Sequence, residues 1–120
     1  MAHLDPSPGG IRRFDSGATR DTNLGKLDYD GFLSPLVIRR YAEYMHAHRL
    51  QSDGMLRDSD NWQKGIPQDE YRKSAWRHWM DWWSWCRGRP IEGDVEDVAC
   101  ALLFNVMGWL HERLKQERTL

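Results

Sequence analysis

The sequence has little cysteine and no excess of positive charge. Only Cys86 and Cys100 are present, without the spacing of a disulfide framework or a paired-cysteine metal site, so we expect a reducing, cytoplasmic environment. The 17 Lys and Arg residues are balanced by 18 Asp and Glu residues. This balance argues against nucleic acid as a stable partner, because such binding depends on a basic surplus.

Long apolar segments are also missing. The opening segment MAHLDPSPGG lacks the apolar core of a signal peptide. No apolar run reaches the ~18 residues that a membrane-spanning helix needs. We therefore expect a soluble protein without a membrane partner.

Tryptophan, in contrast, is abundant. The chain has seven tryptophans, and five of them lie between Trp76 and Trp85. Tryptophan contributes a large buried area and is enriched at interfaces. In a chain this short, such a density predicts a homo-oligomer.

The chain is expected to consist of a flexible N-terminal arm, residues 1–25, and one helical domain, residues 26–120. The arm is rich in Pro, Gly, Asp and Ser and has no apolar period. In the domain, helical spacing and end signals predict three main helices: from about Pro35 to Leu50, from about Gln68 to Arg87, and from Asp94 onward. A long loop, Gln51–Pro67, follows the first helix. No segment has the period of a strand, so the predicted fold class is all-α, a small helical bundle.

Asn105 interrupts the apolar pattern of the third helix. Every other residue from Val98 to Leu110 is apolar or small, and a buried amide needs hydrogen-bond partners. One interpretation is a core asparagine that fixes helix register. The other follows from Asp97, which lies eight residues earlier on the same stripe of the helix. A carboxylate and an amide on one stripe, separated by Ala101, leave room for a ligand or a hydrated cation.

Polar residues also gather in the second helix, within the segment SAWRHWMD. His78 lies among tryptophans, which is typical of a core histidine, and Arg77 and Asp81 have the spacing of a surface ion pair. Facing helices of a bundle also build ligand or metal sites from such residues. In the first helix, Glu43 lies roughly opposite the apolar stripe and is typical of a solvated acid.

Trp62 and Lys64 stand in the most turn-like segment, DSDNWQKGIP. Either Trp62 packs the loop onto the bundle, or it stacks on a ligand while Lys64 reaches toward an anion. Nearer the start of the chain, Arg20 and Lys26 lie beside glycines. Flexible backbone with spaced cations suits phosphate, although an ordinary solvated arm has the same composition.

Four ordered segments resemble a known family. GATRDTNLGKLDYDGFLSP, DNWQKGIP, SAWRH and EDVACALLFN are similar, in order and spacing, to short and largely phage-encoded proteins described as the N-terminal domain of dATP/dGTP diphosphohydrolases. The similarity spans about Ser16 to Leu114. Val98 and Phe104 stand where the family often has histidine and tryptophan. The family's possible relatives, the all-α nucleotide pyrophosphohydrolases, carry E-x-x-E patterns that this sequence lacks.

The resemblance implies hydrolysis of a purine deoxynucleoside triphosphate to the monophosphate and pyrophosphate with Mg²⁺ or Mn²⁺, in a host cytoplasm if the chain is phage-encoded. With that activity in view, hard cations require carboxylates, and the expected metal ligands are Glu43, Asp81 and Asp97. The expected catalytic residues are His78, Asp97 and Asn105. The expected substrate-binding residues are Arg20, Lys26, Asn61, Trp62, Lys64 and Arg77. The alternative is a non-catalytic nucleotide-binding or oligomeric interaction protein of phage origin, since helix-borne acids are few.

Overall fold

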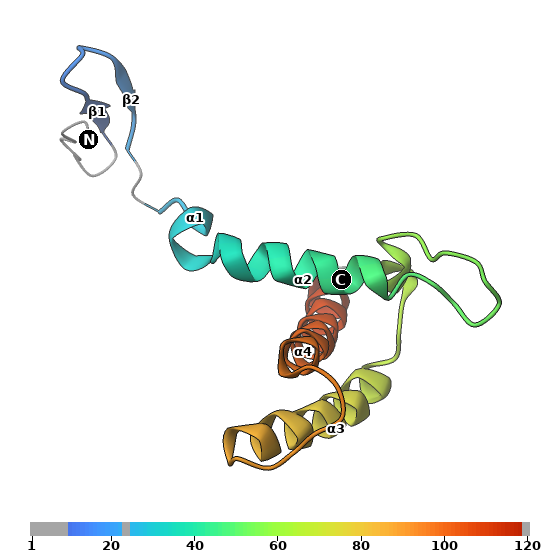
Figure 1. Cartoon of the computed structure of the whole chain (residues 1–120). Coiled ribbons are helices and arrows are strands. Elements are labelled where there is room, and N and C mark those ends of the chain that lie inside the picture. The colour runs from blue at the N-terminus through green and yellow to red at the C-terminus, as the bar shows by residue number, and fades with distance from the viewer. Residues whose placement is uncertain (1–9, 23–24, 119–120) are drawn as a thin grey trace. The chain divides into compact units, whose positions relative to one another are not determined.

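The computed structural model describes residues 10–22 and 25–118 and contains helices with one small sheet (Figure 1). The chain divides into two compact units, residues 1–34 and 35–120. The predicted flexible arm lies in the first unit, and its residues 1–9 and 23–24 are outside the described residues. No described helix is both long enough and apolar enough to cross a membrane.

The first unit contains a β-hairpin that the sequence analysis did not predict. Strands β1 (Ile11–Arg13) and β2 (Thr19–Asp21) pair antiparallel, with Arg12 opposite Arg20. Arg12 is buried, and its Nε donates to the Asp21 carbonyl at 2.7 Å. Strands of three residues are too short for a period-two signal, and this explains the difference. A one-turn helix, α1 (Tyr29–Phe32), follows.

The second unit contains the three main helices, and this confirms the predicted helical character. They are α2 (Pro35–Ala47), α3 (Gln68–Cys86) and α4 (Val95–Arg118). Their ends follow local signals: Gly88 has φ 78° beyond α3, and Asp94 Oδ1 accepts from the Glu96 amide at 2.7 Å at the start of α4. A short 3₁₀ helix, η1 (Asn61–Lys64), lies within the loop predicted at 51–67.

Helix α2 ends earlier than predicted because the following backbone pairs with itself. Leu50 forms an isolated antiparallel bridge with Leu56, and the Arg57 amide donates to the Arg49 carbonyl at 2.7 Å. These hydrogen bonds use backbone groups that a longer helix would need. The chain therefore reverses direction between Leu50 and Leu56.

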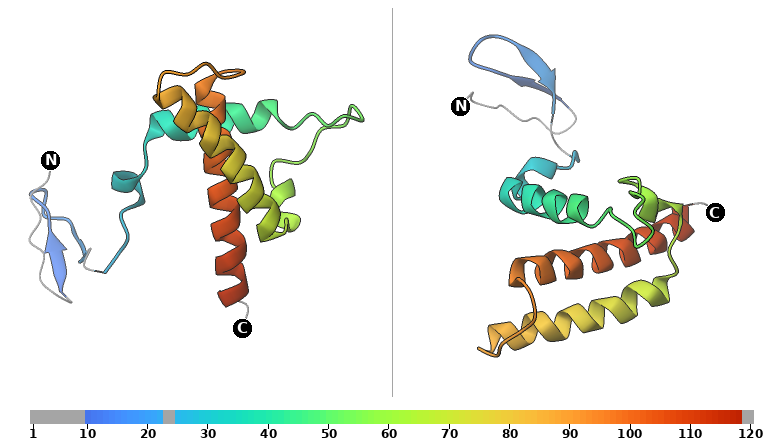
Figure 2. Two further views of the ribbon diagram at one scale, coloured as in Figure 1. Left: turned by 90° about the horizontal axis from the view of Figure 1, so that it is seen from below. Right: turned by 45° about the vertical axis from the view of Figure 1, so that its right-hand side comes forward.

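Helix α4 lies between α2 and α3 (Figure 2). Helices α3 and α4 are antiparallel, since Gln68 at the start of α3 donates to the Trp109 carbonyl of α4 at 3.2 Å. Their contact centres on Tyr71, which is 1 % exposed, and on Gly108. A Cβ at position 108 would overlap the Tyr71 ring, so glycine permits this close approach.

Most tryptophans of α3 lie outside the core of the single chain. Tyr71 is the buried residue of α3, whereas Trp76, Trp79, Trp83 and Trp85 are exposed. The apolar residues buried in the described part of the chain are Tyr71, Val98, Cys100 and Ala101. Four of the five tryptophans of α3 thus lie at the surface of a single chain.

We expect Gly108→Ala to destabilise the protein, although the same change usually stabilises a helix interior by about 1 kcal/mol. The added methyl group would push into the Tyr71 ring, and overpacking costs about 1–3 kcal/mol. Urea denaturation measures the free energy of unfolding. As a control, the substitution is repeated in a Tyr71→Ala background, where it should become neutral or stabilising. A stabilised single variant would contradict this packing.

Candidate functional site

A cleft of about 740 Å³ is the candidate site in the second unit. Its walls come from α2, from the loop that contains η1, from α3 and from α4. Because these segments are distant in the sequence, the cleft depends on the packing of the whole unit. Its lining combines aromatic, amide, imidazole and guanidinium side chains.

The cleft brings together four of the predicted site residues. Asn61 and Trp62 come from η1, His78 from α3 and Asn105 from α4. The other predicted residues do not line it. In the second unit these are Glu43, Lys64, Arg77 and Asp81, all exposed, and the half-buried Asp97. Arg20 and Lys26 are exposed residues of the first unit.

Trp62 anchors the loop and also contributes to the cleft wall. Its ring meets the His111 ring of α4 edge to face, with 4.7 Å between centroids. The packing interpretation of this loop tryptophan is thus supported. Trp62 is only partly buried and lines the cleft, so part of the indole remains available to a ligand.

Glu112 provides a second anchor for the loop, and the sequence analysis missed it. This buried carboxylate accepts from the Ile66 amide at 3.4 Å and lies 3.1 Å from Lys115 Nζ. The hydrogen bond from Lys115 lowers the pKa of Glu112, as does that from Ile66, while burial opposes both. Glu112 and Lys115 are three residues apart, the spacing of an ordinary ion pair on a helix surface. This spacing gives no sign that Glu112 contacts the loop.

Asn105 is buried, as both of its interpretations required. It is 6 % exposed, and its Nδ2 donates to the Ala101 carbonyl at 2.7 Å. The amide therefore finds a partner in its own helix. It also lines the cleft. Asn105 is therefore both a buried core residue and a residue of the candidate site.

Two arginines line the cleft that the sequence analysis did not select. Arg49 Nε donates to the Arg57 carbonyl at 2.7 Å, and Arg57 Nη1 donates to the His48 carbonyl at 3.4 Å. These hydrogen bonds fix the two side chains across the turn after α2. In the sequence the two arginines flank the segment from Leu50 to Leu56, which gives no sign that they meet. Only the folded turn brings them together.

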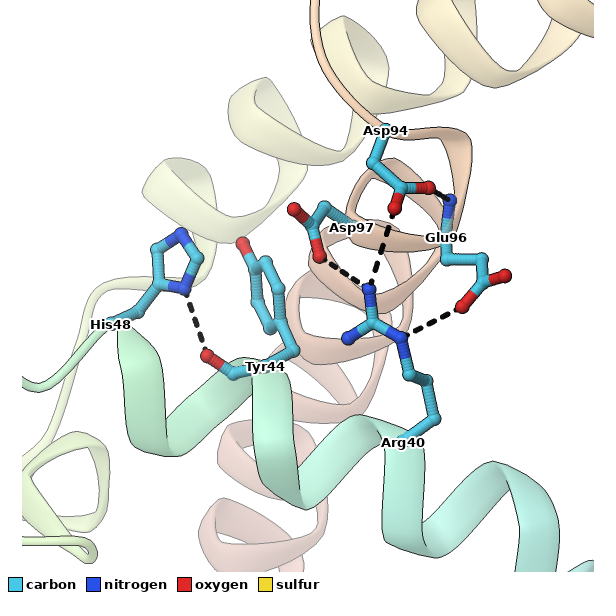
Figure 3. Close-up of polar contacts among 6 residues, drawn as sticks. All are labelled: Arg40, Tyr44, His48, Asp94, Glu96 and Asp97. Carbon is cyan, nitrogen blue, oxygen red and sulfur yellow. Dashed lines mark hydrogen bonds and ion pairs between the residues drawn. The ribbon is translucent and has the colours of Figure 1, made fainter.

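Imidazoles add to the polar lining. His46, His48 and His78 all border the cleft. The Nδ1 of His48 lies 2.8 Å from the Tyr44 carbonyl, which can only accept, so Nδ1 carries the proton (Figure 3). The His48 and Tyr44 rings are 4.0 Å apart, and this contact holds the imidazole against α2.

The charge of the cleft favours an anion. Arg49 and Arg57 are permanent cations, and Asp58 is the acidic residue in the lining. The neutral donors nearby are the Asn61 amide and the Ser59 hydroxyl. A phosphate-bearing ligand fits this set of donors better than a metal ion does.

The predicted metal ligands do not assemble into a site. Asp97 Oδ1 accepts from Arg40 Nη2 at 2.6 Å, and Glu96 Oε1 accepts from Arg40 Nε at 2.8 Å (Figure 3). The Arg40 guanidinium thus occupies the place expected for a cation. Within residues 10–22 and 25–118, no group of three or more His, Cys, Asp or Glu side chains is arranged to hold a metal ion. The residues present do not fit the metal that the resemblance implies.

The surroundings of His78 favour its neutral form. Burial lowers its pKa below the ordinary value, Arg77 lowers it further, and Asp81 opposes them. A neutral imidazole at the cleft can accept a proton from a bound group.

Comparison of the chain with models of protein families, with curated proteins and with solved structures found no match.

We expect His78 to make the protein less stable in mild acid. Because its pKa is lowered in the folded state, the unfolded chain binds the proton more readily. Stability is therefore full above the ordinary histidine pKa of about 6.5 and falls as pH drops through that value toward the lower folded pKa. Thermal unfolding at neutral and mildly acidic pH measures this loss. His78→Gln should reduce the loss, and an equal loss in both proteins would rule out His78 as its source.

Proposed function

We propose that the cleft binds a purine deoxynucleoside triphosphate and that the protein hydrolyses it to the monophosphate and pyrophosphate. The observation that carries the proposal is the convergence of an indole, two guanidinium groups, three imidazoles and two amides on one cleft. Its volume of about 740 Å³ lies within the ~300–1,000 Å³ of small-molecule sites.

The phosphates bind beside Arg49 and Arg57 in this proposal. Guanidinium groups match the geometry of phosphate oxygens, and the backbone hydrogen bonds of Arg49 and Arg57 orient them in advance. Preorganised side chains lose less conformational entropy when a ligand binds. These arginines take the place of Arg20, Lys26, Lys64 and Arg77 as the principal phosphate contacts.

The base stacks on Trp62. A purine offers the larger aromatic face, and stacking on an aromatic side chain contributes about 1–3 kcal/mol per base. Asn61 lies next to Trp62 and also lines the cleft. Its amide can donate and accept at once, which suits the edge of a purine.

Hydrolysis is supported by the family resemblance and by the neutral His78, which can take a proton from an attacking water. The chemistry of triphosphate hydrolysis normally includes a hard cation. Because Asp97 is engaged by Arg40 and the other predicted ligands are dispersed, we assign no residue of this chain to that ion. Self-association of the chain is also part of the proposed function, since four tryptophans of α3 are exposed.

The dispersed carboxylates favour a second candidate function, a nucleotide-binding protein without catalysis. Incubation of the purified protein with each deoxynucleoside triphosphate and Mg²⁺ or Mn²⁺, followed by chromatography, separates the two functions. Monophosphate and pyrophosphate from a purine substrate establish the enzyme. Binding without products, measured by titration calorimetry, establishes the second function.

We expect Trp62→Leu to weaken binding of dATP or dGTP by roughly tenfold or more, because it removes base stacking. Leucine keeps apolar contact with His111, so folding should be retained. Titration calorimetry measures the affinity. Trp62→Phe, which keeps an aromatic ring, should retain most of it. Trp85→Leu is a matched control, since Trp85 lies outside the cleft. Equal affinities for wild type and Trp62→Leu would contradict the assigned base site.

A further inference from the structure

A second hollow, here called the apolar groove, lies between α3 and α4. It encloses about 400 Å³, and its lining includes Ala75, Trp76, Trp79, Leu102, Val106 and Trp109. The residues of α3 that line the cleft are different ones, Ser74 and His78. Since successive helix residues are 100° apart, groove and cleft lie on opposite sides of the α3–α4 contact. Asn105 borders both.

The groove is bordered by aromatic residues that this chain leaves in water. Trp76 is 62 % exposed, Trp79 and Trp109 are each 40 % exposed, and Val106 is 53 % exposed. Trp83, 46 % exposed, continues the stripe of α3 one heptad beyond Trp76. Apolar stripes on adjacent helices at these spacings are typical of residues that face another helix.

The exposed aromatic area approaches that of an interface. The exposed fractions of Trp76, Trp79, Trp83 and Trp109 add up to nearly two whole tryptophan residues. This corresponds to roughly 400 Å² of exposed surface per chain. Two copies would bury roughly 800 Å² of aromatic surface before the flanking residues are counted. Flanking residues such as Val106, which is 53 % exposed, would have to supply the rest of the ~1,200 Å² at which stable interfaces begin.

The core of the single chain is correspondingly small. The buried apolar residues of the described part are four, and three of them are a valine, a cysteine and an alanine. A unit of this length normally buries more apolar surface than that. The groove face, with its exposed tryptophans, is one place where further apolar contacts could form.

The charge pattern allows two identical faces to meet. Arg72 is the charged residue in the groove lining, and it pairs with Asp69 at 3.3 Å. The remaining lining residues carry no charge, so self-pairing brings no uncompensated like charges together. Two antiparallel α3–α4 pairs packed through these faces would form a four-helix bundle, a common arrangement for apolar helix pairs.

We propose that the apolar groove is the surface on which a second copy of this chain docks, in a two-fold arrangement that places Trp76 of each copy into the other's groove. The nucleotide cleft stays open in this dimer because the two hollows lie on opposite sides of the α3–α4 pair. The proposal does not depend on nucleotide binding.

Sedimentation velocity of the full chain over a wide range of concentrations, without nucleotide, tests the dimer. Wild type should sediment with twice the mass of one chain. Trp76→Glu should raise the dissociation constant about tenfold or more, because it buries two carboxylates at the centre of the contact. Trp85→Glu is the matched control: it changes the same residue type in the same helix, 51 % exposed and outside the groove. This control should remain dimeric.

Circular dichroism verifies that each variant keeps its helices, and Val106→Glu on α4 replaces Trp76→Glu if the latter does not fold. A wild type that is monomeric at every concentration would overturn the proposal and leave the groove to a different partner. A Trp76→Glu protein as dimeric as wild type would overturn the location of the interface. A chain that dimerises without binding nucleotide would refute only the proposed function.

Discussion

The contact between Tyr71 and Gly108 is the constraint on which the rest of the structure depends. A glycine inside α4 costs helix stability relative to alanine, but here it lets a whole phenol ring pack against the helix backbone. The Phe104 ring meets Tyr71 edge to face, with centroids 5.7 Å apart. This packing sets the distance between α3 and α4, and therefore the positions of His78 and Asn105, which border the same cleft.

The opposite wall of the cleft is held by different forces. Helix α2 has no buried residue, and it is joined to the start of α4 by the ion pairs of Arg40 with Glu96 and Asp97. Such partly exposed pairs contribute little individually and weaken with salt. The cleft thus has one wall fixed by the packing of Tyr71 on Gly108, and one wall, α2, attached by partly buried side chains and by ion pairs. A ligand that contacts both walls would add to the attachment of α2.

Local signals allowed the main helices to be predicted, because a proline at a helix start or a glycine beyond its end acts on its own neighbours. The site was predicted only in part. Trp62, His78 and Asn105 were found because each breaks a local pattern, and Asn61 came from the family resemblance; all four line the cleft. The ion pair of Asp97 with Arg40 was missed because the two residues are 57 positions apart. Helical spacing shows which residues share one side of a helix, but not which other helix packs against that side. Arg49 and Arg57 were missed for the same reason, since only the turn after α2 joins them.

Four of the seven tryptophans are divided unequally between the two hollows. The cleft receives its one tryptophan from the loop, and the groove receives three from α3 and α4. A polar hollow with a single indole suits a small charged ligand, which needs one stacking surface and several hydrogen-bond donors. A face made of several indoles suits a protein surface, which must exclude water over a large area. The same helix pair therefore carries both surfaces, with the amide of Asn105 between them. Because α3 and α4 are locked together at Tyr71 and Gly108, packing on the groove side restrains the cleft side as well.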